Sequence, residues 1–104
     1  MPGGLKAMEV LNFTYPARQP VARRVHVGVV GSGDLEVLLE PSLDQHTHVA
    51  VTTSVDGFGA VWKIVLDRFF GRFAGAARIE INDFGATPGV VMLRLEQAVE
   101  ALRT

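Results

Sequence analysis

The chain has 104 residues, 48 % of them hydrophobic and 20 % charged, and its ten Lys and Arg nearly balance eleven Asp and Glu, for a formal net charge of −1. A single soluble, cytoplasmic domain is expected, because there is no basic surface for nucleic acid, no apolar run of membrane-spanning length and no apolar core of a signal peptide. The absence of cysteine excludes disulfides, thiolate catalysis and cysteine-ligated zinc.

The first half of the chain alternates apolar and polar residues, as β-strands do. Residues 1–8 are expected to be a leader, and residues 9–104 a single domain. The expected strands span residues 9–15, 23–30, 34–40 and 49–53. The second and third flank a short Gly/Ser/Asp connection and predict a β-hairpin. The fourth is expected to end in a turn at residues 54–57.

In the second half, apolar residues recur every three or four positions from Phe58, which predicts an amphipathic helix ending near Gly71. The recurring positions are Val61, Ile64, Val65, Arg68 and Phe69, and the helix is expected to pack Trp62, Val65 and Phe69 on the sheet. A fifth strand is expected over 78–82, and Thr87 and Pro88 predict the N-cap and first residue of a second helix. One face of that helix is expected to be lined by Val91, Leu95, Ala98, Val99 and Leu102. This order predicts an α+β fold: a mainly antiparallel sheet of four to five strands with two helices on one face.

The turn Gly31-Ser32-Gly33-Asp34 is the most informative feature. Ser32 is expected at an exposed tip, with no side chain on either neighbour to shield its hydroxyl from a modifying enzyme. Gly-Ser-Gly-Asp is also good turn chemistry with no function at all. Glu36 stands where a dinucleotide fingerprint needs its third glycine, and Val30 and Asp34 replace the two glycines of a nucleophile elbow.

Other candidate residues favour ordinary structural roles. His46 and His48 precede a strand, and without a nearby third ligand a solvated loop is favoured over a metal site. His26 is too far from the turn for a Ser-His-Asp triad. Asp83-Phe84-Gly85 looks like the kinase magnesium motif but is interpreted as a turn. Aromatic residues crowd the first helix, most expected in the core and one or two on a partner surface: Phe58, Trp62, Phe69, Phe70 and Phe73.

Three separated segments together resemble the acyl carrier protein (delta subunit) of bacterial malonate decarboxylase: Gly28–Val37, Thr53–Asp56 and Asp83–Val90. The likeness runs from about Met8 to the end of the chain. The chain is also similar, more distantly, to the acyl carrier subunit of citrate lyase. In both families a serine carries a 2′-(5″-phosphoribosyl)-3′-dephospho-coenzyme A group through a phosphodiester. The resemblance assigns that attachment to Ser32.

The resemblance further implies that Gly31, Gly33 and Asp34 support the turn, and that the chain is a non-catalytic subunit. Its arm would hold acetyl and malonyl thioesters while malonate is converted to acetate and CO2. The implied partners are acyltransferase and decarboxylase subunits and a prosthetic-group transferase. Two alternatives stay open: a small assembly or interaction subunit without a prosthetic group, and a minor enzyme using Asp34 or Asp56 as acid or base.

Overall fold

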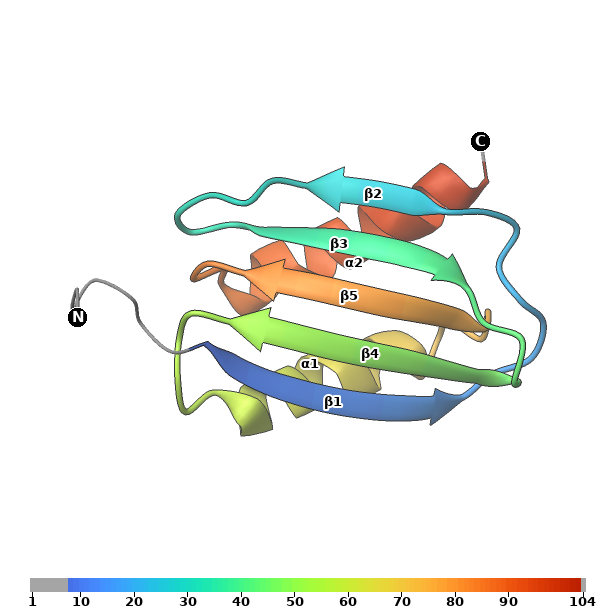
Figure 1. Ribbon diagram of the computed structural model, residues 1–104, viewed down its shortest axis with the longest axis horizontal. Helices are drawn as coiled ribbons and strands as arrows, with labels where there is room; N and C mark the ends of the chain where they lie inside the picture. Colours follow the sequence, from blue (N-terminus) through green and yellow to red (C-terminus); the bar gives the residue numbers. More distant parts are fainter. Residues whose placement is uncertain (1–7, 104) are drawn as a thin grey trace.

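The computed structural model describes residues 8–103, which form a five-stranded sheet with two helices behind one of its faces (Figure 1). The elements are β1 (Glu9–Pro16), β2 (Val25–Gly28), β3 (Leu35–Pro41), β4 (His46–Thr53), α1 (Gly59–Phe70), β5 (Ala77–Asp83) and α2 (Pro88–Leu102). The predicted α+β architecture is therefore confirmed. The predicted leader lies outside the described residues, apart from Met8.

The strand order is β1-β4-β5-β3-β2, with β4 and β5 parallel and the other neighbours antiparallel. Helix α1 makes the crossover that a parallel pair needs. Because of this order, the loops of residues 29–34, 54–58 and 84–87 meet at one edge of the sheet, the left-hand edge in Figure 1. We call it the Ser32 edge.

The core lies between the sheet and the helices. Alternate residues of the central strands are buried there: Leu35, Val37, Leu39, Val49, Val51, Ile79 and Ile81. Helix α2 buries Val91, Leu95 and Ala98, as predicted, and the Thr87 hydroxyl caps it by accepting a hydrogen bond from the Val90 N–H at 3.3 Å. No helix among the described residues is long and apolar enough to cross a membrane.

Helix α1 buries a different stripe from the one that its apolar period indicated. Val61 and Ile64, two of the recurring apolar positions, are 38 % and 59 % exposed. Trp62, Leu66 and Phe69 are buried instead. Apolar residues occupy both faces of this helix, so periodicity does not select one, and burying the larger side chains removes more apolar area from water.

The prediction that Trp62 and Phe69 pack in the core is confirmed, and Val65 packs against that core while half-buried. The other aromatic residues near the helix are less buried. Phe70 and Phe73 are half-buried, and Phe58 is 48 % exposed.

We expect Trp62→Ala to lower the free energy of unfolding by about 3–5 kcal/mol, because it leaves a cavity in the core. The matched control is Ile64→Ala on the exposed face of the same helix, for which we expect a change within about 0.5 kcal/mol. Denaturant unfolding measures both. Equal losses in the two variants would contradict the assigned face.

Candidate functional site

Ser32 lies in a turn on the loop that joins the antiparallel strands β2 and β3. The Asp34 N–H donates to the Gly31 carbonyl at 3.0 Å, which closes the turn. Gly33, at its third position, has a φ of 77°, as a type II turn requires. Ser32 itself is exposed. The predicted exposure of Ser32 at a turn between two antiparallel strands is confirmed.

The strand before this loop is shorter than predicted, whereas the strand after it has the predicted length. Strand β2 ends at Gly28, whose φ is 82° and where an added Cβ would lie 2.1 Å from the Leu35 carbonyl oxygen. Only glycine fits this close approach, and the chain leaves the ladder there. Val29 and Val30 are consequently 58 % and 59 % exposed instead of continuing the strand. The predicted strand ends at residues 23 and 30 are therefore wrong.

Asp34 is held by helix α2. Arg94 Nε donates to Asp34 Oδ1 at 3.1 Å and Arg94 Nη2 to Oδ2 at 2.6 Å, a bidentate pair. The Arg94 side chain is only 24 % exposed and the Asp34 side chain only 20 % exposed. Hydrogen bonds from Arg94, and then from the Leu35 N–H, hold the pKa of Asp34 below its usual range. The sequence gives no signal for this pair, whose members lie 60 residues apart.

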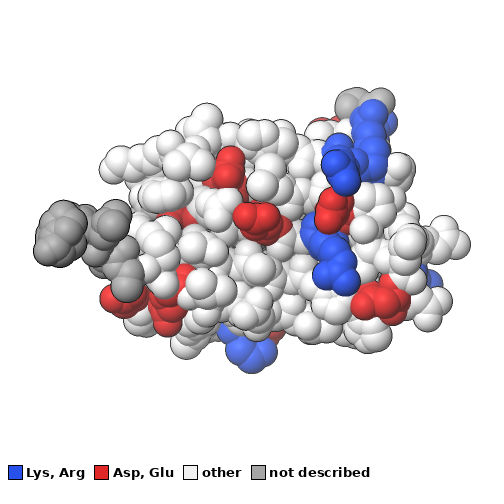
Figure 2. Space-filling view, viewed as in Figure 1, with Lys and Arg blue, Asp and Glu red and all other residues white. Residues whose placement is uncertain are grey.

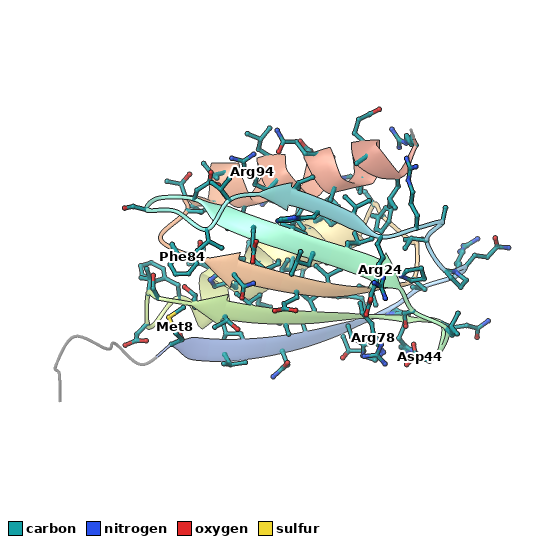
Figure 3. All side chains as sticks on the ribbon, turned by 45° about the horizontal axis from the view of Figure 1, so that its top comes forward. Met8, Arg24, Asp44, Arg78, Phe84 and Arg94 are labelled. Atoms are coloured by element: carbon teal, nitrogen blue, oxygen red, sulfur yellow. The ribbon has the colours of Figure 1, made fainter. Side chains whose placement is uncertain are left out.

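The loop also bonds to the backbone that follows β5. The Gly33 N–H donates to the Phe84 carbonyl at 2.7 Å, and the Phe84 N–H donates to the Asp34 carbonyl at 2.9 Å. Figure 3 shows Phe84 and Arg94 on opposite sides of this loop. Ser32 thus projects from a backbone that is held on both sides, which fixes where its hydroxyl is presented.

The same edge contains a buried polar pair. Thr53 and Asp83 are 0 % and 3 % exposed, and the Thr53 hydroxyl donates to Asp83 Oδ2 at 2.7 Å. The Ala86 N–H donates to Asp83 Oδ1 at 3.0 Å, so both carboxylate oxygens have partners. The Ser54 N–H donates to the Asp83 carbonyl at 3.1 Å. The three segments that carry the family resemblance therefore meet at the Ser32 edge.

The histidines lie elsewhere. His46 and His48 belong to β4 instead of preceding it, and both bond to Asp44: His46 Nδ1 lies 2.9 Å from its carbonyl oxygen and His48 Nε2 2.7 Å from its carboxylate. His26 Nε2 lies 3.1 Å from Glu36 Oε2. Asp56, the other acid considered, is exposed in the turn after β4. The structure brings none of these side chains to Ser32.

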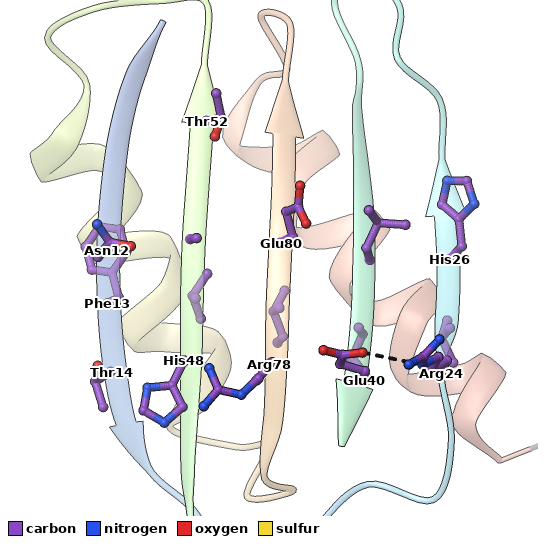
Figure 4. Close-up of a pocket in the computed structure, with 16 residues that line it drawn as sticks. Asn12, Phe13, Thr14, Arg24, His26, Glu40, His48, Thr52, Arg78 and Glu80 are labelled. Atoms are coloured by element: carbon purple, nitrogen blue, oxygen red, sulfur yellow. Dashed lines mark ion pairs between the residues drawn. The ribbon is translucent and has the colours of Figure 1, made fainter. Parts of the chain in front are cut away.

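A hollow of about 910 Å³ crosses the outer face of the sheet and has mixed charge. Arg24 pairs with Glu40 there at 3.4 Å, and Arg78 and Glu80 lie nearby (Figure 4). The basic residues of this face gather at the end away from the Ser32 edge (Figure 2). This hollow is therefore separate from the Ser32 turn.

Comparison with known proteins identifies the family. Residues 22–102 match the family model of the malonate decarboxylase delta subunit (MdcD). The chain is 53 % identical over 94 residues to the malonate decarboxylase acyl carrier protein of Azotobacter vinelandii, covering 89 % of this chain and 95 % of that protein. It is 54 % identical over 96 residues to that of Pseudomonas savastanoi pv. phaseolicola, covering 91 % and 97 %.

A solved structure shares the fold. A chain from a Pseudomonas malonate decarboxylase hetero-tetramer in complex with malonate superposes with a TM-score of 0.88 at 52 % identity, covering 91 % of this chain and 99 % of that one. The shared class is thus a small α+β carrier domain. The chain belongs to the malonate decarboxylase delta subunit family and is an acyl carrier subunit.

We expect Gly28→Ala to destabilise the protein more than Gly57→Ala. Both glycines have positive φ, 82° and 86°, but an added Cβ at Gly57 meets nothing within 4 Å, whereas at Gly28 it meets the Leu35 carbonyl. Gly57→Ala should therefore cost only the backbone strain of about 1–2 kcal/mol. Denaturant unfolding tests the order, and equal costs would show that the β2–β3 loop relaxes freely.

We expect Asp34→Asn to lower stability at pH 7. The pKa of Asp34 is depressed in the folded protein, so its contribution is present above the unfolded pKa of about 3.9 and is lost as the pH falls through the lower folded value. The difference from wild type should therefore shrink below about pH 4. Unfolding curves from pH 3 to 7 test this, with Asp56→Asn as the exposed control. A difference independent of pH would rule out the pairing.

Proposed function

We propose that Ser32 is the attachment site of a 2′-(5″-phosphoribosyl)-3′-dephospho-coenzyme A arm, and that this chain is the non-catalytic carrier of a cytoplasmic malonate decarboxylase complex. The observation that carries the proposal is an exposed serine on a turn whose backbone is fixed on both sides. Family membership supports it, since the relatives are named acyl carrier proteins.

The surroundings of Ser32 fit such a group. A Cβ added to Gly33 would meet nothing within 4 Å, and one at Gly31 would meet only Val29 Cγ2 at 3.8 Å, so the turn has space for a bulky substituent. An anionic phosphodiester would lie two residues from Asp34. Because Arg94 pairs that carboxylate, the arm does not meet an unpaired negative charge.

For attachment, this chain has to supply only a nucleophilic oxygen. Ser32 Oγ would bond to the phosphorus of a phosphoric anhydride donor, the anhydride P–O bond would break and release its other phosphate part as an anion, and the serine proton would pass to a base on the prosthetic-group transferase. When attached, the arm supplies the thiol that this cysteine-free chain lacks, on which acetyl and malonyl thioesters exchange as malonate becomes acetate and CO2.

The chain's own contribution is to tether and present that thiol to the acyltransferase and decarboxylase subunits. Tethering keeps a reacting group near its partner sites at an effective concentration of roughly millimolar. The carboxylates considered as catalytic groups support a carrier over an enzyme, because Asp34 is paired with Arg94 and Asp56 is exposed in the turn after β4. Assembly of the related Pseudomonas protein in a hetero-tetramer supports the choice of partners.

We expect Ser32→Ala to remain folded, with a stability change within about 0.5 kcal/mol, and to abolish both loading and malonate turnover of the reconstituted complex. Intact mass of protein purified from its native host detects the arm as a discrete addition. Ser54→Ala, a half-buried serine of the same edge, is the matched control and should keep the added mass. An unmodified wild-type chain in an active complex would favour the interaction subunit without a prosthetic group.

A further inference from the structure

An apolar groove of about 330 Å³ opens at the Ser32 edge, between the first turns of the two helices and the loops after β4 and β5. Its lining includes Phe58, Val61, Trp62, Val65, Ala86 and Val91. Phe58 and Val61 are the exposed members, 48 % and 38 %, whereas Trp62 is 6 % exposed. The groove therefore offers apolar contact at its rim as well as in its interior.

The polar side chains on the groove wall are already bonded. Thr53 and Asp83 bond to each other, and the Thr87 hydroxyl caps α2. Among the described residues, no buried side-chain nitrogen or oxygen lacks a hydrogen-bond partner. An occupant therefore gains from apolar contact, while a charged occupant would lose its hydration without finding an unpaired polar side chain in exchange.

The groove begins next to the Ser32 turn. Gly85 lines it, and a Cβ built on Gly85 would lie 3.9 Å from both the nitrogen and the Cα of Gly33. Gly33 directly follows Ser32 in the chain. Ser32, which does not itself line the groove, is therefore one residue away from backbone that contacts a groove-lining segment, and a long arm attached to its Oγ can reach the groove.

We propose, on the basis of the proposed carrier function, that this groove binds the pantetheine end of the arm when it bears a free thiol or a neutral acetyl thioester, and excludes the malonyl form. The malonyl carboxylate would be desolvated in an apolar groove whose wall contains the Asp83 carboxylate. Weak binding suffices, because the tethered end is present at an effective concentration of roughly millimolar. Exchange of acetyl for malonyl thus releases the arm towards the decarboxylating partner.

The first test uses untethered probes on the unmodified protein. S-acetyl-pantetheine should bind with a Kd of roughly millimolar, matching the effective concentration of a tethered end. Binding should change the fluorescence of Trp62, the only tryptophan, and shift the methyl NMR signals of Val61, Ala86 and Val91. Malonyl-pantetheine should give no such shifts at the same concentrations. Absence of the acetyl shifts, or equal binding of both probes, would overturn the proposal.

Two substitutions on α1 form a matched pair for the same measurement. Val61→Gln places an amide in the groove and should weaken acetyl-probe binding roughly tenfold, the scale of one lost apolar contact. Ile64→Gln, exposed on the same helix but outside the groove, should bind as wild type does. Thermal melting checks that both variants are folded, and equal binding by the two would locate the probe elsewhere.

The loaded protein gives an independent readout. The thiol of the arm should react more slowly with a soluble thiol reagent in wild type and Ile64→Gln than in Val61→Gln. Equal rates in all three loaded proteins would overturn the groove proposal and leave attachment at Ser32 intact. Failure of loading, seen in the intact mass, would instead contradict the proposed function while the free-probe titration still tests the groove.

Discussion

The insertion of β5 between β3 and β4 is the constraint on which the Ser32 edge depends. It brings the end of β5 beside the turn after β4 and beside the β2–β3 loop, and it buries the carboxylate of Asp83. A buried polar group without a partner costs about 1–3 kcal/mol, and more when charged. The Thr53 hydroxyl and the Ala86 N–H satisfy Asp83, and the bond from Thr53 joins the end of β4 to the end of β5.

The loop that carries Ser32 is attached to the backbone that follows Asp83. Backbone bonds to Phe84 hold one side, and the ion pair between Asp34 and Arg94 holds the other. Gly28 lets the chain leave the sheet so that Val29 and Val30 lie exposed beside the serine. In the proposed function this loop is a fixed point of attachment, so the attached group would have to supply the movement between partner sites.

Local features were predictable from the sequence, and long-range pairings were not. The Ser32 turn, the Thr87 cap and the buried face of α2 each depend on neighbours within a few residues, and all were predicted. The place of β5 and the pairing of Asp34 with Arg94 depend on contacts across the sheet that alternation does not encode. The apolar period of α1 did not by itself select the buried face, because Val61 and Ile64 are as apolar as the residues that fill the core.

Ser32 alone would be an ordinary turn residue, and its functional interpretation depends on what surrounds it. The nearby groove is apolar, and the Asp83 carboxylate on its wall is hydrogen-bonded to the Thr53 hydroxyl. The charge of Asp34, two residues after Ser32, is neutralised by Arg94. These surroundings tolerate a neutral ligand in the groove and an anionic ester at the serine. In the proposed carrier this separation would let the charge of the load determine where the load rests, with no conformational change required of the protein.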